Sequence, residues 1–182
     1  MNTLDATLLQ TLADREAIRD CLYRYCRGID RLDAEALRSA YWPDGTDNHG
    51  AYKGSAQGFI DMALEKLQGA GRMVHSISNI LIELRGDVAA VESYFQAWQA
   101  DRDAQGQPQD TFLCGRYVDR FERRGGEWRV ADRTVVYDWI RQTPLPPGTD
   151  LERFGVRQPM GGRKPDDAVY ALLSQAPFNT PR

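Results

Sequence analysis

The chain has 182 residues, of which 42% are hydrophobic, and this length fits one domain of ordinary size with a real core. The formal net charge is −3 with mixed signs, which argues against a nucleic-acid partner and against binding to an anionic membrane. Residues 1–30 contain acidic side chains and no unbroken apolar block, so we expect no signal peptide, no membrane span and a cytoplasmic location.

The first predicted helix carries apolar residues at three- and four-residue spacing. It begins near Leu8, and its stripe consists of Ile18, Cys21, Leu22, Tyr25, Cys26 and Ile29. Asp30 falls at the edge of this stripe, so Tyr25 and Asp30 are both expected to face the interior. The three cysteines, Cys21, Cys26 and Cys114, have no C-x-x-C spacing and predict buried or free thiols in a reducing compartment.

Two shorter helices and a polar segment follow. Asp33 is a predicted N-cap for a second helix that ends near residues 41–42. Residues 46–54 are too polar for a core strand and predict a hairpin edge or loop. Ser55 is the predicted N-cap of a third helix over residues 56–67, whose buried side is expected to hold Phe59, Met62, Ala63 and Leu67.

Residues 73–84 predict a strand that carries one of the two histidines of the chain. Alternation places Met73, His75, Ile77, Asn79 and Leu81 on one face and Val74, Ser76, Ser78, Ile80 and Ile82 on the other. Neither face is cleanly polar, so we expect both to be covered and His75 to lie away from open water.

Three more long strands are predicted over residues 88–98, 111–123 and 128–141, joined by glycine-containing turns and a polar loop. The predicted fold class is α+β: a strongly curved antiparallel sheet wrapped over about three N-terminal helices as a cone-shaped barrel. Residues 1–142 form this domain. The proline- and glycine-rich residues 143–182 form an arm that packs on its own or a neighbouring subunit.

The central chemical hypothesis is a buried pair of His75 and Asp30. A carboxylate that holds one imidazole nitrogen fixes the tautomer and stabilises the imidazolium, so the other nitrogen can act as a base. The alternative is that Asp30 only caps the loop before Arg31 and that His75 is a satisfied core histidine.

Arg133 and Tyr25 each have two interpretations. Arg133 shares an apolar strand face with Ala131 and Val135, so its charge needs a partner. It holds a substrate oxygen or a departing anion, or it pairs with a neighbour of Asp132 or with Glu92. Tyr25 donates a hydrogen bond to a substrate carbonyl, or it is an ordinary aromatic core residue.

No motif predicts a cofactor. Asp47 and His49 lie two residues apart, but two ligands fall short of the three or four that zinc requires, so we expect no metal. The sequence lacks G-x-G-x-x-G, P-loop and G-x-S-x-G patterns, which argues against nucleotide cofactors and serine hydrolysis.

Several strings together resemble the SnoaL-like group of the nuclear-transport-factor-2-like superfamily over about residues 8–141. They are residues 17–20 (AIRD), 25–30 (YCRGID), 47–50 (DNHG), 74–75 (VH), 115–121 (GRYVDRF), 128–130 (WRV) and Arg133. The pattern is similar to the lyases and isomerases of that group, which include bile acid 7α-dehydratase, scytalone dehydratase and hexachlorocyclohexane dehydrochlorinase. The resemblance implies that His75 is the general base, Asp30 its orienting carboxylate, and Arg133 a stabiliser of the leaving group or oxyanion.

Tyr25 falls where the dehydratase-like members place a tyrosine and the dehydrochlorinase a lysine, which favours water loss or a proton shift in an oxygenated ring compound. We therefore predict a cofactor-independent dehydratase or isomerase of a hydrophobic cyclic substrate, steroid-like or aromatic. The alternatives are a non-catalytic ligand-binding protein and the small subunit of a ring-hydroxylating dioxygenase. The chain is expected to form a homodimer or homotrimer. The expected substrate contacts are Trp42, His49, Met62, Tyr94, Trp98, Phe112, Tyr117 and Tyr137.

Overall fold

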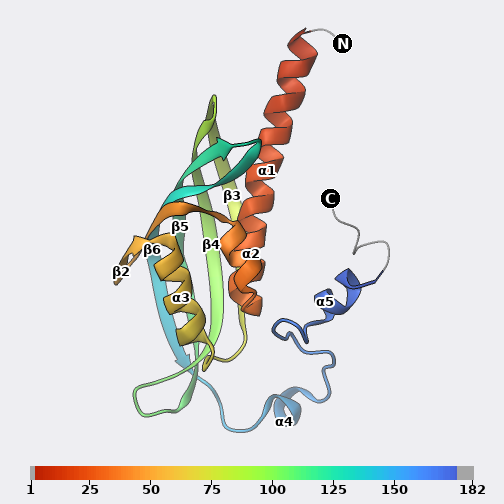
Figure 1. Ribbon diagram of the computed structural model, residues 1–182. Coiled ribbons are helices and arrows are strands. Elements are labelled where there is room, and N and C mark those ends of the chain that lie inside the picture. Colours follow the sequence, from red (N-terminus) through yellow and green to blue (C-terminus); the bar gives the residue numbers. More distant parts are fainter. Residues whose placement is uncertain (1–2, 176–182) are drawn as a thin grey trace.

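The computed structural model describes residues 3–175 and has helices on the concave face of a curved sheet (Figure 1). The helices of this part are α1 (Thr3–Arg31), α2 (Ala34–Ser39) and α3 (Ala56–Leu67). Six strands follow the order β2-β1-β6-β5-β4-β3. They are β1 (Tyr41–His49), β2 (Tyr52–Ser55), β3 (Met73–Arg85), β4 (Val88–Arg102), β5 (Pro108–Arg124) and β6 (Glu127–Pro144). The predicted α+β class is confirmed. None of the helices within residues 3–175 combines the length and the apolar character that crossing a membrane requires.

The helices form where their caps and apolar stripes predict. The α1 stripe from Ile18 to Ile29 is buried, and a side chain at Gly28 would collide with the backbone of Leu37 in α2. Asp33 accepts a hydrogen bond from the backbone N–H of Ala36, as an N-cap residue does. Ser55 caps α3 in the same way. Helix α2 ends at Ser39, earlier than predicted, because the chain enters β1 at Tyr41.

The predicted sheet was antiparallel throughout, but the observed sheet contains one parallel pair of strands. The polar residues 46–49 belong to β1, which pairs antiparallel with β2 and parallel with β6, with Asp47 opposite Arg133. Their polarity does not prevent strand pairing because the side chains have partners. Thr46 donates to Asp132 at 2.6 Å, and the buried Asp47 accepts from the Tyr41 hydroxyl at 2.6 Å.

A bulge in β3 changes which residues face the helices. Asn79 has a φ of 46°, and the pairing with β4 shifts between Ser78 and Leu81. His75 lies on the helix-facing side before the bulge. Ile82 lies on that side after it, whereas Leu81 is 62% exposed. The prediction that Leu81 shares a face with His75 was therefore wrong.

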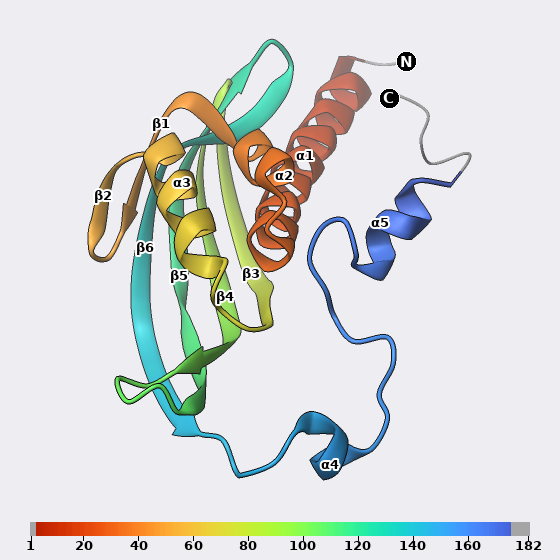
Figure 2. The ribbon, with the colours of Figure 1, turned by 60° about the horizontal axis from the view of Figure 1, so that its bottom comes forward.

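The segment after β6 carries α4 (Asp150–Phe154) and α5 (Ala168–Leu173) and runs past the C-terminal end of α1 (Figure 2). Polar contacts hold it to the same chain. The backbone N–H of Lys164 donates to the carbonyl of Arg31, and the Lys164 Nζ and the Tyr170 hydroxyl both bind Asp33. Residues 176–182 of the predicted arm lie outside the described residues. The division into a 1–142 domain and a 143–182 arm remains a proposal.

Candidate functional site

His75 and Asp30 meet where the end of α1 crosses the start of β3. The Asp30 Oδ1 lies 2.6 Å from the His75 Nδ1, and its Oδ2 accepts the backbone N–H of His75 at 2.9 Å. The side chains are 16% and 8% exposed. Because one carboxylate binds both the ring and the backbone of His75, the imidazole orientation is fixed. The neutral ring carries its proton on Nδ1 beside Asp30, so Nε2 is the nitrogen that can accept a proton.

Arg133 is buried within a cage of aromatic rings. Its guanidinium donates two hydrogen bonds to Asp119, at 2.8 and 2.7 Å, and lies about 4 Å from the ring centroids of Tyr25 and Tyr117. Both side chains of this ion pair are 0% exposed. Burial opposes the charge, but the attraction of Asp119 holds the pKa of Arg133 well above its ordinary range.

This pairing corrects the expected partners of Arg133. Asp132 pairs with Arg120, and Glu92 lies near Arg116. As a whole residue, Arg133 is 2% exposed in this arrangement, so it is sealed from solvent. One of its nitrogens, Nη1, has no hydrogen-bond partner within residues 3–175.

Tyr25 lies in the same cage as an aromatic core residue. Its ring makes edge contacts with Tyr41 and Tyr117, and burial raises the pKa of its hydroxyl well above the ordinary value of 10.0. Tyr25 therefore stays protonated across the neutral range. Tyr117, one of the expected substrate contacts, is likewise buried against Arg133.

A second histidine–aspartate pair lies on β1. The His49 Nδ1 is 3.2 Å from Asp47 Oδ1, and its ring stacks on Phe59 at a centroid distance of 4.2 Å. Tyr137 of β6 approaches His49 edge-on at 6.1 Å. Within residues 3–175, no group of three His, Cys, Asp or Glu side chains is arranged to hold a metal ion.

Four of the expected substrate contacts lie on the outer side of the sheet. The burial of Ser93, Phe95 and Ala97 in β4 turns Tyr94 and Trp98 outward by alternation, and Phe112 pairs with Trp98 on β5. Trp42 donates to the carbonyl of Glu122 and stacks against arginines outside the core. These four side chains therefore do not face the interior of the cone, although Trp98 borders the pocket beside Asp30. Met62 is 40% exposed and not among the buried residues of α3, so its predicted place on the buried side of that helix was wrong.

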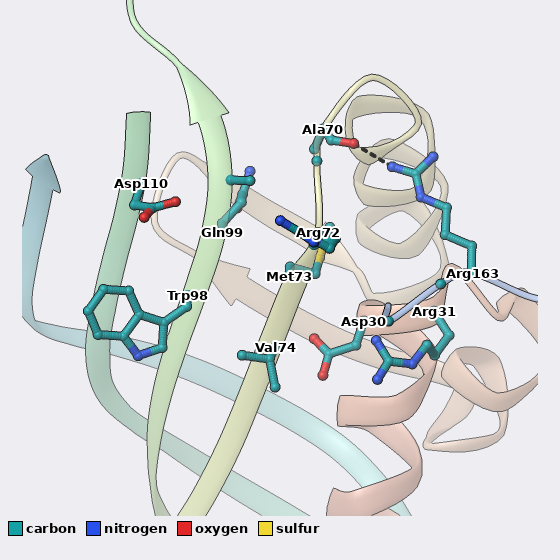
Figure 3. Close-up of a pocket in the computed structure, with 14 residues that line it drawn as sticks. Asp30, Arg31, Ala70, Arg72, Met73, Val74, Trp98, Gln99, Asp110 and Arg163 are labelled. Carbon is teal, nitrogen blue, oxygen red and sulfur yellow. Dashed lines mark hydrogen bonds between the residues drawn. The ribbon is translucent and has the colours of Figure 1, made fainter. Parts of the chain in front are cut away.

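A pocket of about 590 Å³ borders Asp30, the carboxylate of the dyad. Its walls come from the end of α1, the start of β3, β4 and residues 161–163 of the arm (Figure 3). Asp30, Met73 and Trp98 contribute to it, so the carboxylate that binds His75 is also part of a pocket wall. Arg31, Arg72 and Arg163 also line it. Sequence reasoning did not single out these arginines, because only the fold brings them to one place.

Comparisons with known proteins agree with this architecture. The SnoaL-like domain family matches residues 10–134. No curated protein matches the chain. A hexachlorocyclohexane dehydrochlorinase (LinA type 2) structure is 22% identical with a TM-score of 0.68 and covers 78% of this chain and 99% of its own.

Two proteins from Novosphingobium aromaticivorans are also similar. A scytalone dehydratase-like protein is 21% identical, with a TM-score of 0.64, over 75% of this chain and 91% of its own. A protein described as the beta subunit of an aromatic-ring-hydroxylating dioxygenase is 23% identical, with a TM-score of 0.57, over 74% of this chain and 99% of its own. At these identities the likeness establishes the fold and not the activity.

Proposed function

This chain belongs to the SnoaL-like domain family, and from that membership we propose that it is a cofactor-independent lyase, a dehydratase, or an isomerase of a hydrophobic cyclic compound. The observation that carries the proposal is the double hydrogen bond from Asp30 to the ring and backbone of His75. A histidine that serves only the core does not need its orientation fixed so closely. A general base does, because proton transfer requires the accepting nitrogen at a set position.

In the proposed reaction, Nε2 of His75 removes a proton from a carbon next to a substrate carbonyl. The imidazolium that forms is stabilised by Asp30, which lies 2.6 Å from Nδ1. The resulting enolate either expels the hydroxyl group on the neighbouring carbon, which leaves as water with the proton that His75 holds, or takes that proton back at another carbon. The first outcome is dehydration and the second is isomerisation.

Arg133 and Tyr25 remain part of the proposed site, but as buried residues that support it. Both side chains are buried, so in the structure they support the site by packing. The ion pair of Arg133 with Asp119 is neutral overall, so the proposed stabilisation of an enolate oxygen falls to Nη1, the guanidinium nitrogen that has no hydrogen-bond partner within residues 3–175. His49 and Tyr137 remain the proposed ligand contacts that face the helices and keep partial exposure.

A second candidate function is the small subunit of a ring-hydroxylating dioxygenase. The observation that favours it is the similarity to a beta subunit, together with large apolar side chains on the outer face of the sheet, such as Trp98 and Trp139. In that case the outer face would be an interface and the dyad would have no substrate. A third hypothesis is a non-catalytic binding protein, which would bind its ligand and release it chemically unchanged.

Ligand-dependent thermal unfolding combined with mass analysis tests the proposal. Wild type, His75→Ala and Arg85→Gln are each incubated with steroids, bile-acid-like compounds and hydroxylated aromatics. We expect a compound that raises the unfolding midpoint and loses the mass of water, or shifts a double bond at constant mass, with wild type and Arg85→Gln only. Arg85→Gln is the control because Arg85 lies on the same strand as His75, at its opposite and exposed end. Equal conversion by His75→Ala would exclude His75 as the base.

A further inference from the structure

A groove of about 1000 Å³ adjoins the pocket at Asp30. Both hollows share Arg72, Ala100 and Asp110 in their walls, so they lie side by side. The groove continues along the arm to α4 and is lined there by Leu151, Arg153, Phe154, Val156, Arg157 and Met160, among others. One elongated ligand can therefore reach from the α4 end of the groove to the carboxylate of the dyad.

The walls of the two hollows are basic in an acidic protein. They hold five arginines and three aspartates, a formal charge of +2, whereas the whole chain carries −3. The arginines are Arg31, Arg72, Arg153, Arg157 and Arg163, and the aspartates are Asp30, Asp110 and Asp150. Two of the aspartates already have partners: Asp30 binds His75, and Asp150 binds both Arg72 and Arg153.

Two arginines of these walls have no carboxylate partner within the described residues. Arg157 donates to the carbonyl oxygen of Val156, and Arg163 donates to the carbonyls of Leu67, Gln68 and Ala70. Arg163 is thus occupied in holding the arm against the end of α3 (Figure 3). Arg157 lies at the α4 end of the groove, where its guanidinium is free to bind an anion.

Apolar side chains beside Arg157 are left in contact with water. Leu151, Phe154, Val156 and Met160 are between 40% and 71% exposed, although all four line the groove. A contiguous apolar surface rimmed by cations is typical of a site that takes a ligand with both characters. A purely apolar ligand would leave the arginines unused.

We propose that the groove binds the anionic end of an amphiphilic substrate. That the ligand is a substrate rests on the proposed function. Arg157 and Arg153 hold an oxyanion, either a carboxylate or a phosphate monoester. The apolar part of the molecule lies along Phe154 and Met160 toward Asp30, which binds His75. Asp110 is part of the wall that both hollows share, and its negative charge repels an anion there, which places the anion at the α4 end. The proposed substrate class is thus a cyclic compound that carries an acidic tail.

Calorimetric titration with three ten-carbon probes tests this inference without requiring turnover. The probes are decanoate, decyl phosphate and the uncharged decan-1-ol. We expect at least one anion to bind wild type about tenfold more tightly than the alcohol, and Arg157→Gln to remove most of that difference. Arg157→Lys should retain part of it. Arg157 is exposed and, within residues 3–175, bonds only to a neighbouring carbonyl, so its loss should not affect folding.

Arg85→Gln is the matched control, because Arg85 is 85% exposed at the opposite end of β3 and its loss changes the net charge equally. Equal affinity for the alcohol and the anions would overturn the inference. Equal effects of the Arg157 and Arg85 variants on anion affinity would also overturn it. So would a lack of anion binding, as when a second copy of the chain covers the groove. The preferred anion identifies a carboxylate or a phosphate substrate. His75→Ala should bind the anions like wild type, so failure of the proposed catalysis and failure of this site give different results.

Discussion

The buried pair of Arg133 and Asp119 is the residue-scale feature that explains most about the interior. The sequence predicted that Arg133 needed a partner on its apolar face, but it did not predict Asp119. Counting back from the β5–β6 turn, a regular hairpin would place Asp119 opposite Asp132. The bulge between Arg120 and Phe121 advances the register by one residue and sets Asp119 opposite Arg133. No local sequence signal indicated that bulge.

Arg133→Gln should strongly destabilise the fold because it leaves the Asp119 carboxylate buried without a cation. We expect the free energy of unfolding to fall by about 3–5 kcal/mol, measured by urea unfolding followed by tryptophan fluorescence. Arg120→Gln breaks a half-exposed pair with Asp132 and should cost no more than about 1 kcal/mol. If the two variants proved equally stable, the packing role assigned to Arg133 would be wrong.

At the scale of elements, the strand that carries His75 was predicted to within one residue of its observed end, but its faces were not. The reversal occurs at Asn79, whose positive φ is uncommon for a residue other than glycine. Asparagine tolerates this conformation, and it is the only hint in the sequence. The predicted direction of His75 was not affected, because His75 precedes the bulge and simple alternation still holds there.

The arm should be released in acid. Burial alone would raise the pKa of Asp33, but hydrogen bonds from Lys164, Ala36 and Tyr170 hold it below the ordinary value of 3.8. Hydrogen bonds also lower the pKa values of Asp150, bound by Arg72, and of Asp167, bound by backbone N–H groups. A carboxyl group with a lowered pKa in the docked state stabilises docking fully above its ordinary value. That contribution is lost as the pH falls through the lowered value.

We therefore expect amide NMR signals from residues 150–173 to move toward unfolded positions as the pH falls below about 3.8, before those of β4 and β5. In Asp33→Asn, the same change should begin at a higher pH because the ion pair with Lys164 is gone. Simultaneous loss of arm and sheet signals in both proteins would show that these carboxyl groups do not control docking.

At the scale of the whole molecule, the helix-then-strand order predicted the fold class, and the turn signals predicted the strand pairs β3–β4, β4–β5 and β5–β6. The parallel pairing of β1 with β6 could not be predicted, because it joins segments more than 80 residues apart through polar contacts such as Thr46 to Asp132. The inward or outward direction of Tyr94, Trp98 and Phe112 was equally unpredictable, since aromatic residues occur on both faces of this sheet.

The outer face of the sheet carries Leu81, Tyr94, Trp98 and Trp139, which are between 42% and 62% exposed. Apolar exposure of this kind marks association surfaces, and we expect the lone chain to form a homodimer or homotrimer in size-exclusion chromatography with light scattering. Trp139→Glu should shift the equilibrium toward monomer, whereas Arg85→Gln should not. A monomeric wild-type chain would instead favour the dioxygenase-subunit alternative, which requires a different partner.

The most direct test of the central claim, that His75 is a general base, is exchange of substrate protons in deuterium oxide. Each carbonyl compound that raises the unfolding midpoint is incubated with wild type, His75→Ala or Arg85→Gln, and its mass is followed over time. We expect deuterium incorporation next to the carbonyl with wild type and Arg85→Gln, and only the uncatalysed rate with His75→Ala. Incorporation at the wild-type rate in His75→Ala, or none with any protein, would contradict it.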